Sequence, residues 1–168
     1  LEPDFADEHS PGYLRYQADL VWLDAELVHS DAADLMRQLE LASRHRTPDV
    51  VAAISAAYTG KFALDFAYDD WSTDFRDRLH AAYLSVLEGE IRAELEAGRT
   101  SRGIELARRA LEVDAEATEI ELLLVRLYAV GGWHAAAAEQ YGHYASAMRE
   151  DLGVEVPPLE ALRPSGPV

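Results

Sequence analysis

Several residue types that carry chemistry or mark a location are scarce or missing in this sequence. It has no cysteine, which excludes a disulfide scaffold, a thiolate metal site and a cysteine nucleophile. Its longest strongly apolar stretch, Leu122 to Val125, is far shorter than the roughly 20 residues that cross a bilayer. No signal peptide is visible, and the chain opens at Leu1 rather than at a methionine. We therefore expect a fragment of a cytoplasmic protein with no membrane partner.

Positive charge is also scarce. The chain holds 15 lysine and arginine residues against 31 aspartate and glutamate residues, a formal net charge of −16. Such an excess repels the phosphate backbone, whereas DNA binding requires several lysines and arginines that neutralise phosphates. The acidity favours solubility, and the alternative is an acidic surface that meets a basic partner. We expect that this chain does not bind DNA by itself.

The common motifs of catalytic and metal sites are missing as well. No nucleotide-binding Gly-rich loop with Gly-Lys-Ser/Thr, no Gly-x-Ser-x-Gly elbow and no His-Glu-x-x-His helix occurs, and no two histidines stand three or four residues apart. One acidic group marks a helix start, where it suits the helix dipole, and divalent-ion binding is the alternative. Its members are Asp69, Asp70, Asp74 and Asp77. We predict no enzyme activity, no cofactor, and no catalytic, cofactor-binding or metal-binding residue.

The first 29 residues combine a linker with the only strand signal of the chain. Residues 1–12 are rich in proline, glycine and acidic residues, which is typical of a tail. Tyr13 to Tyr16 and Leu20 to Leu23 are β-favouring, and residues 17–19 between them suit a hairpin turn. An isolated hairpin is only marginally stable, so this one needs another surface to pack against.

Residues 30–158 have helical periodicity, and 159–168 have the composition of a fraying tail. Asp31 is expected to cap the first helix, and Thr47 followed by Pro48 to start the second. A long helix is predicted from Asp70 to Gly98, followed by three more helices. The aromatic residues of the preceding loop, with Trp71, are expected to pack into the core. They include Phe62, Phe66 and Tyr68.

A repeat runs through the helical region. Gly98 and Gly132 lie 34 residues apart, and the small residues Gly103 and Ala137 keep the same spacing. A period of 34 residues is that of tetratricopeptide helix pairs, which stack to bury their apolar faces. The alternative is an ordinary helical bundle with glycine C-caps. We predict an all-α, tetratricopeptide-like helical repeat of antiparallel helix pairs, with a small N-terminal β-hairpin appendage.

Three runs, in order, resemble the bacterial transcriptional activator domain found in regulators of the Streptomyces antibiotic regulatory protein type. The first run is carried by Tyr58, Gly60, Phe62, Phe66, Trp71, Arg76 and Leu79. The second is carried by Gly98, Gly103, Ile104, Ala110, Leu111 and Asp114. The third is carried by Leu127, Tyr128, Ala129, Gly132, Ala137, Tyr141, residues 151–154 and Pro157. Ala115 departs from the pattern, which has proline after the aspartate.

The resemblance implies a role and a domain plan. Residues 1–29 would be a linker with a remnant of a winged-helix wing, 30–158 the activator domain and 159–168 a tail. The domain would be a scaffold that regulates transcription through protein contacts, with RNA polymerase or another protomer as partner and a homo-oligomer left open. DNA would be bound only through a winged-helix domain outside this chain. The alternative is a ligand- or peptide-sensing helical repeat of a signalling ATPase, because the fold does not fix the function.

The repeat also predicts a working surface. In stacked helix pairs the first helices line the concave face, and aligning Gly98 with Gly132 matches their positions. The predicted partner-binding residues are Ser85, Glu88, Arg92, Leu95, Glu119, Leu122 and Arg126. Arg92 and Arg126 stand one repeat apart, and a guanidinium suits a carboxylate or a phosphate. They are either ordinary solvated or ion-paired residues, or part of a shallow groove for an acidic or extended segment.

Overall fold

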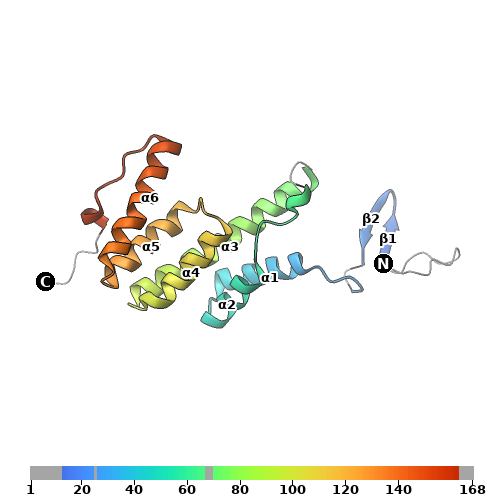
Figure 1. The fold of residues 1–168 in the computed structure, drawn as a ribbon. Coiled ribbons are helices and arrows are strands. Elements are labelled where there is room, and N and C mark those ends of the chain that lie inside the picture. The colour runs from blue at the N-terminus through green and yellow to red at the C-terminus, as the bar shows by residue number, and fades with distance from the viewer. Residues whose placement is uncertain (1–12, 25, 67–69, 163–168) are drawn as a thin grey trace. The chain divides into compact units, whose positions relative to one another are not determined.

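The computed structural model describes residues 13–24, 26–66 and 70–162 (Figure 1). The expectations for residues 1–12, for Asp69 and Tyr68, and for the end of the tail at 163–168 lie outside these ranges. The chain divides into two compact units, Leu1–Asp34 and Leu35–Val168. Within the described residues, no helix is long and apolar enough to cross a membrane.

The first unit contains the predicted hairpin. Strands β1 (Leu14–Gln17) and β2 (Leu20–Leu23) pair antiparallel. Ala18 and Asp19 form the two-residue turn with φ angles of 48° and 66°, and two positive φ values match the right-handed twist of paired strands. All the strand residues are exposed, so the hairpin has no core of its own.

The second unit is a stack of helices. Helix α1 begins in the first unit and continues into the second. Elements α1 to α6 and two short 3-10 turns follow one another along the chain. Their bounds are α1 Asp31–Arg44, α2 Pro48–Ala57, η1 Leu64–Phe66, α3 Asp70–Glu96, α4 Thr100–Val113, α5 Thr118–Val130, α6 His134–Leu152 and η2 Leu159–Leu162. Helices α3 to α6 form two consecutive antiparallel pairs, and α5 also contacts α3 (Figure 1). The predicted all-α helical repeat is confirmed.

Matching caps set the repeat. Gly98 and Gly132 have φ angles of +70° and +80°, a backbone that glycine adopts without strain. After α3, Arg99 N donates to the Glu94 carbonyl and Gly98 N to that of Leu95. After α5, the amides of Trp133 and Gly132 make the equivalent bonds to Tyr128 and Ala129. These are two Schellman motifs one repeat apart, so each pair turns back with the same geometry.

The core lies where α3, α4 and α5 meet. Tyr83, Leu87 and Ile91 of α3 are fully buried, and Leu127 of α5 has no exposed surface either. Gly103 of α4 stands at the closest approach, because a Cβ placed there would lie 2.7 Å from a Leu127 methyl carbon and 3.4 Å from Glu94 Cβ. The outermost helix is packed less deeply, and among its described side chains only Ala137 is buried.

Two helix starts bear on the predicted caps. Thr47 Oγ1 accepts from Val50 N at 3.4 Å, and Pro48 begins α2, as expected. The cap predicted for α1 lies one residue too far along the chain. Ser30, not Asp31, is the cap, because its hydroxyl oxygen accepts from Ala33 N at 3.3 Å and its carbonyl accepts from Asp34 N.

The loop before α3 corrects the prediction of an aromatic core at Phe66 and Trp71, whereas Phe62 is half-buried and packs edge-on against Phe75 of α3 with ring centroids 5.1 Å apart. Phe66 and Trp71 contact each other, with ring centroids 5.7 Å apart, but they are 51% and 66% exposed. A buried arginine secures the loop instead. Arg76 is 6% exposed and donates to the Ala63 carbonyl at 3.2 Å and to Ser72 Oγ at 3.0 Å. A loop carbonyl needs a donor, which a guanidinium offers and an aromatic ring does not.

Candidate protein-binding groove

A groove of about 930 Å³ lies between the first helices of the two pairs, α3 and α5. Five of the seven predicted residues line it, namely Arg92, Leu95, Glu119, Leu122 and Arg126. Ser85 and Glu88 are not among the lining residues. The other lining residues are Glu96, Gly98, Leu123, Val130 and Ala161. We call this surface the arginine groove. Its Arg92 and Arg126 share one surface because the repeated glycine caps place α3 and α5 in equivalent positions.

The two arginines differ in their surroundings. Arg92 is half exposed and bonds through Nη2 to Glu88 Oε1 at 2.5 Å, one helical turn away. The same nitrogen lies 3.9 Å from Glu119 Oε2 on α5. Arg92 is therefore ion-paired, as the plainer interpretation of the sequence expected, and Glu88 supports the groove from outside by holding it.

Arg126 is the unsatisfied cation of the groove. Its side chain is partly buried, its Nε atom is enclosed, and that atom has no hydrogen-bond partner among the described residues. No hydrogen bond or ion pair joins its guanidinium to another described side chain. Burying a polar donor without a partner costs free energy. Because Nε is enclosed, a partner molecule would meet the terminal guanidinium nitrogens of Arg126, which lines the groove.

A comparison of the sequence with known protein families indicates which class of protein carries this groove. The profile described as "bacterial transcriptional activator domain" matches residues 23–163, which is most of the chain. The chain belongs to this family. Its members are domains of transcription regulators, not of enzymes. No curated protein and no solved structure matches the chain significantly.

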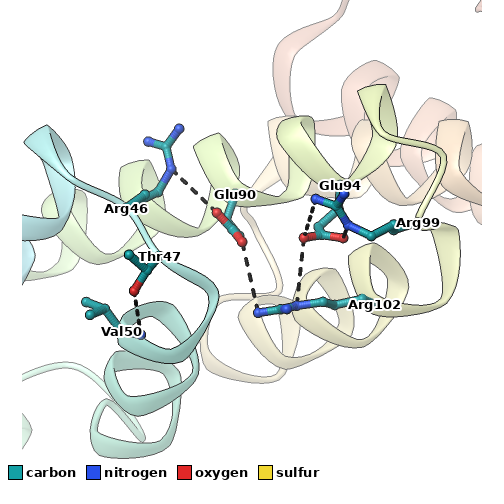
Figure 2. A network of polar contacts seen from close by, with 7 residues as sticks. All are labelled: Arg46, Thr47, Val50, Glu90, Glu94, Arg99 and Arg102. Atoms are coloured by element: carbon teal, nitrogen blue, oxygen red, sulfur yellow. Dashed lines mark hydrogen bonds and ion pairs between the residues drawn. The ribbon is translucent and has the colours of Figure 1, made fainter.

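Beside its groove, the activator domain contains a network of charges that the sequence analysis did not find (Figure 2). Glu90 and Glu94 are buried one turn apart on α3, where two carboxylates repel each other. Arg46 approaches Glu90 at 3.7 Å, Arg99 donates to Glu94 at 2.7 and 3.1 Å, and Arg102 lies within 4.0 Å of both glutamates. The network ties the α1–α2 junction and α4 to α3.

The arginines of the network act on the titration of Glu94. The hydrogen bond from Arg99 lowers the pKa of this carboxyl below its usual value, against the effect of burial, and the charges of Arg99 and Arg102 add to the decrease. Glu94 is therefore held as a carboxylate with no exposed side-chain surface. Its arrangement is structural, because its partners are already in place.

A second polar chain joins the C-terminal ends of α2 and α4 to the interior of α3 in the activator domain. Tyr58 after α2 lies 3.0 Å from His80 Nδ1, and His80 Nε2 lies 2.7 Å from Asp114 Oδ2 after α4. A neutral imidazole with its proton on Nε2 satisfies both bonds. Burial raises the pKa of Tyr58 to about 12, so its hydroxyl stays protonated.

None of these polar groups forms a metal centre. Among the described residues, no group of three or more histidine, aspartate or glutamate side chains could hold a metal ion. The arginine groove and the two internal networks differ in accessibility and in pairing. Of these, only the arginine groove combines an accessible surface with a cation that lacks a partner.

Proposed function

We propose that this domain acts in transcriptional activation as a protein-binding scaffold, and that the arginine groove binds an extended acidic segment of a partner protein. Family membership implies the role in bacterial transcriptional activation. The observation that carries the finer proposal is Arg126, a groove-lining cation whose guanidinium has no hydrogen-bond or ion-pair partner among the described residues.

The chemistry of the groove fits a segment that alternates acidic and apolar side chains. Glu88 and Glu119 already engage Arg92, so Arg126 is the cation that remains for a partner carboxylate. Leu122 and Val130 line the same groove and offer apolar contact. A charge-assisted hydrogen bond contributes about 1.5–3 kcal/mol, which is roughly a 10- to 100-fold change in affinity.

The proposal also covers the partner that supplies the bound segment and the protein that carries the domain. RNA polymerase or a second protomer would supply the bound segment, in the cytoplasm, and a regulator of the Streptomyces antibiotic regulatory protein type would carry the domain. Residues 1–29 would be a linker and the end of a winged-helix wing, which agrees with a hairpin whose strand residues are all exposed. Residues 30–158 would be the scaffold and 159–168 a tail. The family match favours this role over a sensor of a signalling ATPase.

The test is to neutralise each arginine in the regulator that carries this domain. Arg126→Gln is expected to reduce reporter activation at least tenfold and to leave promoter occupancy unchanged, because DNA contact lies elsewhere. Arg92→Gln should have a smaller effect, since Arg92 is already paired. Arg149→Gln is the matched control, an exposed arginine on α6 that does not line the groove.

Reporter activation and promoter occupancy must both be measured for each variant. Full activation by Arg126→Gln would remove the groove from the mechanism. A loss of promoter occupancy would instead assign the defect to the placement of the DNA-binding domain. Thermal unfolding of each variant checks that the fold is retained.

A further inference from the structure

The chain turns back on itself after the last helix. Gly153 ends α6 with a φ of +64°, its amide bonds to the Arg149 carbonyl at 3.1 Å, and Val154 N bonds to that of Met148. Residues 153–162 then run back beside α6 (Figure 1). We call this segment the strap. Residues 159–162, which belong to the predicted tail of 159–168, form the turn η2 at the end of the strap.

One hydrogen bond ties the strap to α6, and another closes its terminal turn. The Tyr141 hydroxyl of α6 donates to the Pro157 carbonyl. Ala161 N then bonds to the Pro158 carbonyl at 2.9 Å, which closes η2. Ala161 lines the arginine groove together with Arg92 and Arg126. The strap therefore occupies space at the surface that the proposed function assigns to a partner.

The strap also has the chemistry that the groove is proposed to bind. It is extended between α6 and η2, and its Pro157-Pro158 pair stiffens it. Its charged residues are Glu155 and Glu160, both exposed and neither joined by an ion pair to a described residue, and its remaining residues are apolar or glycine. Glu160 directly precedes Ala161, but Ala161 is the described strap residue that lines the groove.

We propose that the strap is an internal competitor for the arginine groove, and that a partner segment must displace it. This inference rests on the proposed function and adds its regulation. Few contacts hold the strap, and the helix that carries it has only Ala137 buried among its described side chains. Segments with so few buried contacts open at low free-energy cost. Displacement is then within reach of a partner that also engages Arg126, which the strap leaves unpaired among the described residues.

The test uses a fluorescein-labelled peptide with the sequence of residues 153–162 as the probe, and the whole 168-residue chain. Ala161→Arg places a third cation beside Arg92 and Arg126 and should expel η2. If nine molecules in about ten hold the strap in place, its release raises the apparent affinity for the peptide about tenfold. Tyr141→Phe, which removes one hydrogen bond, should raise it less. Ala138→Arg, an exposed α6 position outside the groove, is the matched control and should change nothing.

Fluorescence anisotropy decides between the outcomes, with thermal unfolding to confirm that each variant is folded. Tighter binding by Ala161→Arg that is lost when Arg126→Gln is added supports the strap as competitor. Equal affinity of Ala161→Arg, Tyr141→Phe and the parent chain overturns it, even if Arg126→Gln still lowers reporter activation. Conversely, Arg126-dependent peptide binding with no effect of Arg126→Gln on activation would keep the competitor and overturn the proposed function.

Discussion

The same substitution at two helical glycines should have opposite effects on stability. At Gly142 of α6, an added Cβ meets no atom within 4 Å, so Gly142→Ala gains only helix propensity, about 0.8–1 kcal/mol. Gly103→Ala gains the same amount, but its Cβ would lie 2.7 and 3.1 Å from the two terminal methyl carbons of Leu127. Leu127 has no exposed surface into which it could rotate. Overpacking of this kind costs about 1–3 kcal/mol.

The difference between the two variants isolates the packing effect, because the propensity gain cancels. Gly142→Ala should therefore be more stable than Gly103→Ala by about 1–3 kcal/mol, with a difference in Tm of about 2–4 °C for each kcal/mol in a chain of this size. Urea unfolding followed by circular dichroism gives the free energies. If Gly103→Ala were stabilised as much as Gly142→Ala, the contact between α4 and α5 would be looser than described, and the packing argument would fail.

Three further predictions follow from exposure, charge and titration. Trp71→Ala should lower the Tm by no more than a few degrees, because the ring is 66% exposed. A much larger decrease in the Tm, measured by calorimetry, would show that Trp71 is part of the core. Glu94→Gln should cost about 1.5–3 kcal/mol near neutral pH, through weakened bonds to Arg99. Since the pKa of Glu94 is lowered in the folded state, its contribution is complete above the ordinary carboxyl pKa of 4.5 and is lost as the pH falls below it. Urea titrations from pH 7 to pH 3 should therefore show the parent chain and Glu94→Gln converging, and a constant gap would contradict this. The chain alone should not bind duplex DNA specifically at low salt, given its charge of −16, and sub-micromolar, sequence-dependent anisotropy changes would refute that.

Local patterns in the sequence were sufficient to predict the helices and the hairpin, but not the 3-10 turns η1 and η2. Thr47 with Pro48, and the glycines at 98, 132 and 153, mark helix ends because capping depends on neighbouring residues. The hairpin turn was predictable for the same reason. The error at Trp71 arose because aromatic content gives no information on whether a covering surface exists. The aromatic pattern predicts Phe66 and Trp71 in the core, whereas their rings contact each other at the surface.

The candidate site was predictable only as far as the repeat extends. The shared spacing placed Arg92 and Arg126 on one surface, but it could not show that Glu88 and Glu119 engage the first of them. Contacts between distant segments have no local pattern. The bond from Arg76 to the Ala63 carbonyl, the His80–Asp114 contact and the placement of Ala161 in the groove all depend on how the helices pack.

The two matching glycine caps make the segment between them a unit that can be copied. Residues 99–132 begin and end at the same backbone geometry, one repeat apart, and a duplicate inserted after Gly132 would start where the original did. Stability in such arrays is approximately the sum of units and of the interfaces between neighbours. A lengthened chain would carry a second copy of Arg126 one repeat further along. The reach of the binding surface could then be extended by whole units, with no new side chain designed.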